Sequence, residues 1–373
     1  MAEVELPEPD RVDGAPHPRE TQQIFGQDAA QAEFLQAFNS GRLHHGWLIT
    51  GPKGIGKATL AWQIARFLLT QPIEQSAGLF GAPEPPTSLA IPPDHPVEAR
   101  IQAMSEPGLF LLRRGPNEKG DKLAADILVK EVRKLKNFFS LSAADGGRRV
   151  VIVDAADEMN VSAANALLKV LEEPPANTIL LLVCHQPSRL LPTIRSRCRE
   201  LRLAPMGPDA MAAALAQAEA PEVENPAALT EISAGSVGEA IRLVNQNGLA
   251  IYQELVDLYG SLPRLDRSRA LKLAESAAAR GAEAKLDLLF ALNDLLLARL
   301  ARAGALGQPP AVEVARGETQ LLARLSSTPH QARAWADLAQ DVGGRTRHGR
   351  AVNLDPAALI LDTVFKIQKT AAG

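Results

Sequence analysis

A glycine-rich loop carries the residues of this sequence that are best suited to bind phosphate groups. The loop reads Gly51-Pro52-Lys53-Gly54-Ile55-Gly56-Lys57, a match to the pattern G-x-x-x-x-G-K. In that pattern backbone N–H groups cradle the phosphates of a nucleotide, and the lysine neutralises their charge. The next residue of the pattern is Ser or Thr, whose hydroxyl binds the Mg²⁺ that bridges the phosphates. Here it is Ala58, which has no oxygen to give to a metal ion.

The hydroxyl of Thr59 comes one residue too late to replace the missing one. A helix turns by about 100° per residue, so we expect this hydroxyl to point away from the metal position. Two interpretations of the loop stay open. It is either a retained turn that is empty, or a site that holds ADP or ATP without cleaving it.

A second candidate residue, Asp154, ends an apolar run at residues 150–153. In ATPases that have such a glycine-rich loop, a carboxylate at the end of a strand organises the metal ion. An acidic residue directly after it orients the attacking water. The neighbour here is Ala155, and the later Asp157 and Glu158 cannot simply replace it. With both the hydroxyl and the base missing, we expect no ATP hydrolysis by this chain alone. The predicted nucleotide-site residues are Gly51, Gly54, Gly56, Lys57, Thr59 and Asp154.

The elements that must position these residues alternate along the chain. Short apolar runs typical of buried strands lie at 47–50, 109–112, 150–154, 179–183 and 201–203. Helical patterns lie between or before them, at 27–40, 60–69, 127–139 and 162–173. This order predicts an α/β fold with a parallel, doubly wound sheet, and it places the glycine loop between a strand and a helix. Beyond Pro205 we expect short helices over 206–246 and longer ones over 248–373.

Two segments rich in proline interrupt this pattern. Residues 1–20 combine prolines with acidic residues, and we interpret them as a loose, disordered tail. Residues 71–100 hold prolines and glycines between two predicted elements, which indicates an inserted loop and not a packed element.

Composition narrows the class of protein. The 373 residues suffice for two or three domains of about 100–200 residues each. A net charge of −3 argues against a protein that grips nucleic acid by itself over a broad basic face. Two cysteines are too few for a disulfide framework or a four-thiolate zinc site. Without a signal-peptide pattern or a long apolar run, we expect a cytoplasmic protein that makes no membrane contact.

Several longer motifs resemble a known family. They are Phe25-Gly26-Gln27, Leu43–Trp47, Asn165–Lys169, Leu171–Pro175 and Ser196-Arg197-Cys198. Together they resemble the clamp-loader subunits of bacterial DNA polymerase III, in the AAA+ superfamily, most strongly over residues 24–204. The resemblance implies a RecA-like P-loop domain at 21–204, a small helical lid at 205–247 and a helical collar for oligomerisation at 248–373.

Departures from the motor type of this family, gamma/tau, favour its delta' type. Besides Ala58 and Ala155, Gly238 stands where the motor subunit has an arginine, and Cys184-His185-Gln186 stands where it has threonines. The end of the chain, at residues 353–356, also resembles the delta' type. The family often carries a four-cysteine zinc module, but no cysteine lies between residues 58 and 149, so we expect no zinc.

The resemblance implies a role for Arg197 in a neighbouring subunit. Family delta' subunits present the arginine of the Ser-Arg-Cys motif to ATP on the adjacent motor subunit, and Arg197 takes that position. The alternative is that Arg195 and Arg197 are ordinary surface arginines. The implied partners are the gamma/tau and delta subunits and, through the complex, the beta sliding clamp and primed DNA.

The chain would then be a non-hydrolysing component of a DNA-directed DNA polymerase holoenzyme that requires no cofactor of its own. Two other functions stay open, an ATP-hydrolysing motor of the gamma/tau type and an AAA+ scaffold unrelated to replication. ATP turnover by the purified chain would favour the first, and failure to join clamp-loader subunits would favour the second.

Overall fold

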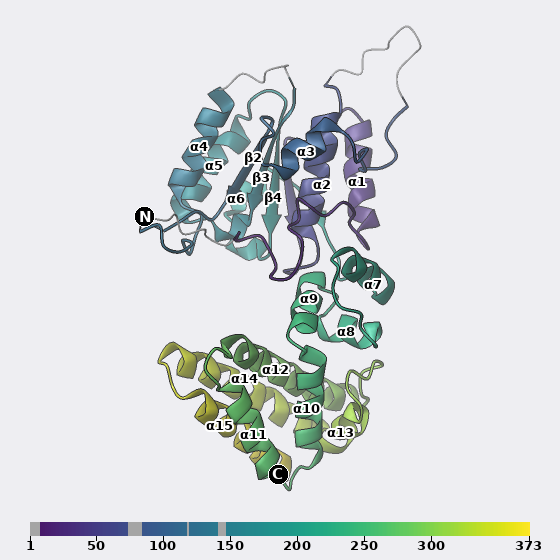
Figure 1. Ribbon diagram of the computed structural model, residues 1–373, viewed down its shortest axis with the longest axis vertical. Helices are drawn as coiled ribbons and strands as arrows, with labels where there is room; N and C mark the ends of the chain where they lie inside the picture. Colours follow the sequence, from purple (N-terminus) through teal and green to yellow (C-terminus); the bar gives the residue numbers. More distant parts are fainter. Residues whose placement is uncertain (1–7, 74–83, 118, 141–146) are drawn as a thin grey trace. The chain divides into compact units, whose positions relative to one another are not determined.

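The computed structural model describes residues 8–73, 84–117, 119–140 and 147–373 of the chain, which divides into two units (Figure 1). The amino-terminal unit comprises Met1–Ala220 and Gly235–Ile241, and the carboxyl-terminal unit comprises Pro221–Ala234 and Arg242–Gly373. The expected lid at 205–247 is therefore shared between the units. Among the described residues, no helix is both long and apolar enough to cross a membrane.

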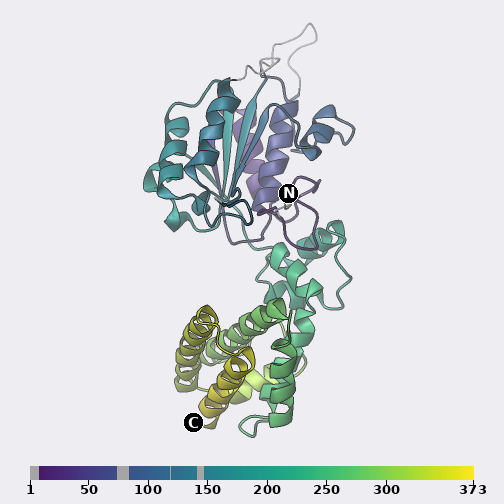
Figure 2. The ribbon, with the colours of Figure 1, turned by 60° about the vertical axis from the view of Figure 1, so that its left-hand side comes forward.

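A parallel sheet forms the centre of the amino-terminal unit (Figure 2). It has five strands in the order β2-β3-β4-β1-β5. The strands are β1 (Gly46–Thr50), β2 (Leu109–Arg113), β3 (Arg149–Asp154), β4 (Thr178–Cys184) and β5 (Arg199–Arg202). The predicted α/β fold and its parallel sheet are confirmed. Continuous apolar runs form the inner strands because helices cover both faces of the sheet, so residues of both pleats are buried.

Helices cover each face of the sheet and divide the core into two layers. On one face, α1 (Asp28–Asn39), α2 (Lys57–Thr70) and α3 (Pro96–Gln102) pack on strand residues such as Ile49 and Ile152. On the other face, α4 (Val129–Ser140), α5 (Val161–Glu172) and α6 (Pro192–Arg195) pack on residues such as Leu48 and Val151. Successive strand residues thus point to opposite layers, as the pleat requires. The unit also contains the turns η1 (Ala156–Glu158) and η2 (Pro187–Arg189) and the helix α7 (Pro208–Gln217).

Two expectations about proline-rich segments need correction. Residues 8–20 do not form a loose tail, because His17 is fully buried and Asp10 is ion-paired to Arg113 of β2. Within the expected insertion at 71–100, Pro96 opens the helix α3, a position that needs no backbone N–H donor, and Val97 and Ile101 are buried in the core. Residues 1–7 and 74–83 of these two segments lie outside the described residues.

The carboxyl-terminal unit is helical throughout its described residues, as the sequence predicts. Its helices are α8 (Pro226–Ile232), α10 (Gly248–Gly260), α11 (Arg267–Ala277), α12 (Glu283–Leu306), α13 (Glu318–Leu325), α14 (Pro329–Ala351) and α15 (Pro356–Ala372). Helix α9 (Val237–Asn245) begins in the amino-terminal unit and ends in this one. Asp355 caps α15 by accepting a hydrogen bond from the Ala358 N–H at 2.8 Å, and Pro356 follows it in the first turn.

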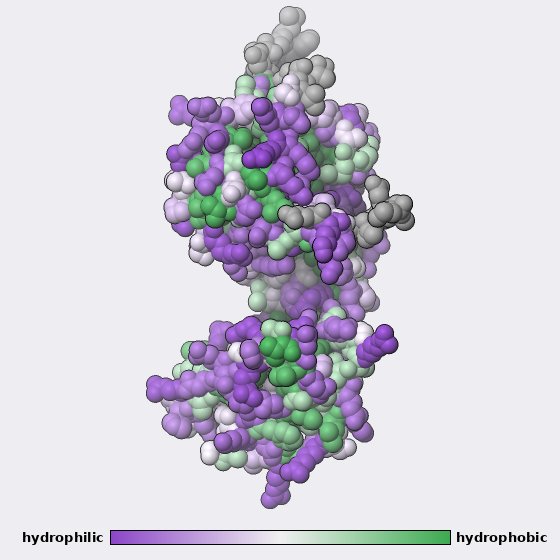
Figure 3. Space-filling model, turned by 90° about the vertical axis from the view of Figure 1, so that its left-hand side faces the viewer, coloured by the Kyte–Doolittle hydropathy of each residue, from purple (hydrophilic) through white to green (hydrophobic). Residues whose placement is uncertain are grey.

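An ionic cluster, mostly buried, holds four of these helices together. Arg299 of α12 donates to Glu318 of α13 at 2.6 Å and to Glu231 of α8 at 2.7 Å. The Tyr252 hydroxyl of α10 also donates to Glu318, at 2.5 Å. Apolar residues are also buried in this unit, among them Leu296, Leu300 and Trp335. The surface view in Figure 3 shows hydrophilic residues over most of the face drawn there. Such a buried, fully partnered cluster fixes α8 to the helices that follow.

Candidate nucleotide site and the opposite edge of the sheet

The glycine loop connects β1 to α2 at the carboxyl edge of the sheet, the strand–loop–helix context that the sequence predicts. Gly54 and Gly56 adopt positive φ angles of 79° and 95°. A side chain at Gly54 would also clash, since its Cβ would lie 2.4 Å from Oγ of Ser236. Gly56 ends the loop, and α2 begins at Lys57 with its free N–H groups toward the loop.

Lys57 is buried and directs its ammonium group at its own loop. Its Nζ donates to the carbonyl of Gly51 at 2.8 Å and also to that of Pro52. Burial lowers the pKa of Lys57 to about 8, although the charges of Asp154 and Asp157 oppose this shift. The lysine is therefore largely charged near pH 7. Its ammonium group is hydrogen-bonded to the loop carbonyls, which take the place that the phosphate of a nucleotide would have as its partner.

Asp154 lies at the same edge, at the end of β3. Burial raises its pKa to about 7, and the nearby carboxylates of Asp10 and Glu158 add to the shift, against the charge of Lys57. Ala58 and Ala155 provide no oxygen beside it. Among the described residues, no group of three or more His, Cys, Asp or Glu side chains could hold a metal ion. The residues present do not fit a hydrolytic magnesium–nucleotide site.

Sequence reasoning missed the part that Asp157 plays at this edge. Its carboxylate accepts hydrogen bonds from the backbone N–H groups of His185, at 2.9 Å, and Gln186, at 3.0 Å, just beyond β4. Burial lowers the pKa of His185 to about 4, so the ring is neutral near pH 7. Asp157 thus connects η1 to the residues that follow β4, and both of its carboxylate oxygens already accept hydrogen bonds.

The start of α9 rests directly on the glycine loop. The Ser236 hydroxyl donates to the carbonyl of Lys53, and the Gly238 N–H donates to the carbonyl of Gly54, both at 2.9 Å. A Cβ at Gly238 would lie 3.1 Å from Cα of Gly54, so a larger residue there would have to push the two segments apart. The absence of an arginine at 238 therefore permits this close contact.

Arg197 lies at the opposite, amino edge of the sheet, between α6 and β5. Its guanidinium makes an ion pair with Glu172 at 3.0 Å and donates to the carbonyl of Thr193 at 3.0 Å. The side chains of both ion-pair partners are well exposed, at 37% for Arg197 and 43% for Glu172. Because β5 runs parallel to β1, at least a four-residue strand, about 13 Å, separates Arg197 from the glycine loop. Arg197 cannot serve the nucleotide site of its own chain.

The structure thus brings most of the predicted site residues together and separates one from them. Gly51, Gly54, Gly56, Lys57 and Asp154 meet at the carboxyl edge. Thr59 lies in the first turn of α2, as expected, and Arg197 lies at the other edge.

Comparison with known proteins then decides the family. A family model described as DNA polymerase III, delta subunit matches residues 26–207. The delta' subunit of Pseudomonas aeruginosa is 37% identical over 248 residues, which are 66% of this chain and 69% of that protein. The chain belongs to the delta' family of DNA polymerase III clamp-loader subunits. This family lies within the AAA+ superfamily.

Other relatives show how far this delta' likeness extends. The Escherichia coli delta' subunit is 32% identical over 213 residues, 57% of this chain and 58% of that protein. A solved gamma subunit-related protein of Thermotoga maritima is 16% identical and covers 91% of this chain and 99% of its own, with a TM-score of 0.41. At that score the structural likeness adds nothing to the fold described above.

Cys198, beside Arg197 in the motif of this delta' chain, is not placed for nucleophilic chemistry. It packs at the margin of the core layer formed by α4, α5 and α6. Burial raises the pKa of its thiol to about 12, so the reactive thiolate is scarce near pH 7. We interpret it as a small packing residue.

Proposed function

We propose that this chain is a ring member of the clamp loader that supplies Arg197 in trans to the ATP site of a neighbouring gamma/tau subunit. With gamma/tau and delta it would help to place the beta sliding clamp on primed DNA in the cytoplasm. The observation that supports the role of Arg197 is its place: an exposed arginine at the edge of the sheet opposite its own glycine loop.

The chemistry of the guanidinium suits this role. It carries a permanent charge on a planar fork, which matches the oxygens of a phosphoryl group under transfer. Exposed ion pairs such as that with Glu172 contribute only about 0–1 kcal/mol, so the arginine can leave its partner at small cost. Arginine fingers in other systems raise the rate by roughly 10³–10⁵.

The carboxyl edge supports the second half of the proposal, that the chain does not hydrolyse ATP itself. Ala58 gives no metal ligand, Ala155 gives no base, and Lys57 is bound to loop carbonyls. The glycine loop would retain at most ADP or ATP without cleaving it. We propose that the site requires no metal, zinc included.

Reconstitution of the loader tests the arginine directly. Arg197→Ala should lower DNA-stimulated ATP turnover of the assembled complex while leaving assembly intact. Arg195→Ala is the matched control, because Arg195 is an exposed arginine two residues away. An unchanged turnover with Arg197→Ala, in a complex of normal composition, would contradict the proposal.

Two simpler measurements test the assignment against its rivals. ATP turnover by the purified chain that Lys57→Ala abolishes would indicate a motor subunit instead. Failure of the chain to co-purify with gamma/tau and delta would rule out a clamp-loader role.

A further inference from the structure

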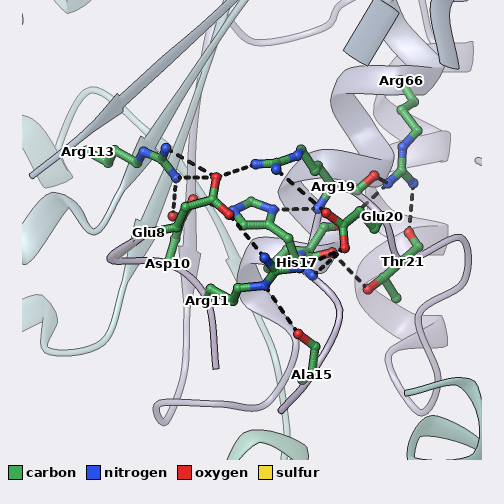
Figure 4. Close-up of polar contacts among 11 residues, drawn as sticks. Glu8, Asp10, Arg11, Ala15, His17, Arg19, Glu20, Thr21, Arg66 and Arg113 are labelled. Atoms are coloured by element: carbon green, nitrogen blue, oxygen red, sulfur yellow. Dashed lines mark hydrogen bonds and ion pairs between the residues drawn. The ribbon is translucent and has the colours of Figure 1, made fainter. Parts of the chain in front are cut away.

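The amino-terminal segment at residues 8–21, here called the strap, crosses the carboxyl edge of the sheet (Figure 4). Its first fixed point is Asp10, whose Oδ1 contacts Arg113 at 2.5 Å and whose Oδ2 contacts Nε2 of His17 at 3.0 Å. The side chains of Asp10 and His17 are 1% and 0% exposed. Arg113 ends β2 and pairs in register with Asp154 of β3, so this contact lies beside the candidate nucleotide site.

Nδ1 of His17 accepts a hydrogen bond from the N–H of Arg19 at 3.0 Å. This bond occupies Nδ1, and Nε2 faces the Asp10 carboxylate in an ion-pair contact. The ring also lies edge-on to Trp62 of α2, with centroids 5.8 Å apart. The strap is therefore held by specific, buried contacts, in contrast to a segment that lies loosely on the surface.

Helix α2 provides the second fixed point. Arg66, which is 3% exposed, donates to the carbonyls of Arg19 at 2.5 Å, Thr21 at 2.9 Å and Pro18 at 3.4 Å. The same guanidinium is ion-paired to Glu98 of α3 at 3.2 Å. One buried arginine thus fixes the backbone of the strap to the helix that follows the glycine loop.

The third point of the strap lies at the glycine loop itself. A Cβ at Gly238 would lie 3.5 Å from Cγ2 of Val12 and 3.1 Å from Cα of Gly54. The strap, the start of α9 and the glycine loop therefore meet at one place. The charge of Asp10 near Asp154 is offset by that of its ion-pair partner Arg113.

We infer that the strap is an intramolecular competitor of the nucleotide: it covers the carboxyl edge of the sheet and lies against the place where the glycine loop meets α9. A nucleotide binds only in the fraction of molecules whose strap is open, so the apparent Kd rises in inverse proportion to that fraction. This inference does not depend on the role of Arg197. It also accounts for the state of Lys57, which is present in the glycine loop but donates its hydrogen bonds to loop carbonyls.

The test compares two arginines that both pair with Glu8. Arg113→Ala removes the tie between the strap and β2, whereas Arg11→Ala removes contacts that lie within the strap. Isothermal titration of the full chain with ADP, and with ATP, should give a Kd roughly 10–100-fold lower for Arg113→Ala than for the unaltered chain. Arg11→Ala should leave the Kd unchanged, and Lys57→Ala added to Arg113→Ala should abolish the gain.

Hydrogen exchange of the strap amides shows whether Arg113→Ala has opened it. A second opened form comes from a specific protease site inserted between the exposed residues Gln22 and Gln23 and cut in the folded chain. Tighter nucleotide binding by either opened form supports the inference. It is overturned if the unaltered chain binds ADP as tightly as the opened forms, or if an opened strap brings no gain.

Discussion

The two edges of the sheet differ in how they hold their charged residues. At the carboxyl edge, Lys57, Asp154 and Asp157 are buried. Lys57 donates to loop carbonyls, Asp157 accepts from backbone N–H groups, and the charge of Lys57 acts on Asp154. At the amino edge, Arg197 and Glu172 form a single ion pair in solvent. Both edges belong to one sheet, so the contrast does not come from the fold.

The contrast indicates which edge can still act on another molecule. A buried charge that loses its partner costs several kcal/mol, so the carboxyl edge resists rearrangement. An exposed pair contributes about 0–1 kcal/mol and can exchange its partner readily. The edge that carries the glycine loop is therefore fixed, and the edge that carries Arg197 is available to a neighbour.

The largest effect should follow the loss of the buried arginine that fixes the strap. Arg66→Ala leaves the Glu98 carboxylate buried without its partner and three strap carbonyls without their donor. Breaking a buried pair in this way costs about 3–5 kcal/mol, and we expect about 5 kcal/mol here. Denaturant unfolding of the amino-terminal unit, followed by fluorescence of Trp47 and Trp62, measures the loss.

Two controls sharpen this prediction. Arg197→Ala should change the same free energy of unfolding by less than about 0.5 kcal/mol, because its ion pair is exposed. The double variant Arg66→Met, Glu98→Gln should lose less than Arg66→Ala, since it leaves no unpaired buried charge. Equal losses for Arg66→Ala and Arg197→Ala would contradict the difference between the two edges.

A smaller effect should appear as pH dependence at the carboxyl edge. Asp154 has a pKa of about 7 in the folded chain against an ordinary value of 3.8. Because folding raises this pKa, the associated stabilisation is complete below about pH 4 and is lost as the pH rises through 7. At about 1.4 kcal/mol per pH unit, the loss is on the order of 4 kcal/mol.

Asp154→Asn should remove this dependence, which unfolding curves at pH 5 to 8 would measure. His185, whose pKa is lowered from 6.5 to about 4, contributes a slope of the opposite sign below about pH 6.5 in both chains, so the difference between the two chains isolates Asp154. Lys57, with a lowered pKa of about 8, affects stability mainly above that pH. If the difference in unfolding free energy between the unaltered chain and Asp154→Asn did not fall as the pH rises from 5 to 7, Asp154 would not carry this dependence.

The sequence predicted those parts of the molecule that depend on local patterns. Strands β1 to β4 each contain a short apolar run, and Asp154 could be placed at a strand end because the run before it is continuous. The glycine loop followed from the spacing of its glycines and lysine. Strand β5 begins at Arg199, two residues before the predicted strand at 201–203. The first residues of this edge strand are polar, so the apolar pattern did not include them.

The parts that the sequence did not predict depend on distant partners. The acidic, proline-rich composition of residues 8–20 is typical of disorder, yet Arg113, Trp62 and Arg66 bury it from more than 40 residues away. The same holds for Asp157, whose partners follow β4. Composition indicates whether a segment can form a hydrophobic core of its own. It does not indicate whether the segment can bind to a core that other parts of the chain form.

The smallest predicted effect concerns the partner of Arg197 at the amino edge. In the proposed loader, Glu172 competes with the phosphate of the neighbouring site for the same guanidinium. Glu172→Gln removes the competing charge, and since an exposed pair contributes at most about 1 kcal/mol, ATP turnover should rise by no more than about fivefold. The rise should shrink at high salt, because exposed charges are screened.

Glu173→Gln provides the matched control, an exposed glutamate next in the chain whose removal should leave turnover unchanged. Turnover of the reconstituted loader with primed DNA, at low and high salt, separates two functions of Glu172. A rise confined to Glu172→Gln means that the glutamate restrains the arginine. A fall would mean that it orients Arg197 toward the neighbour, so that the amino edge, like the carboxyl edge, depends on its ion pair being intact.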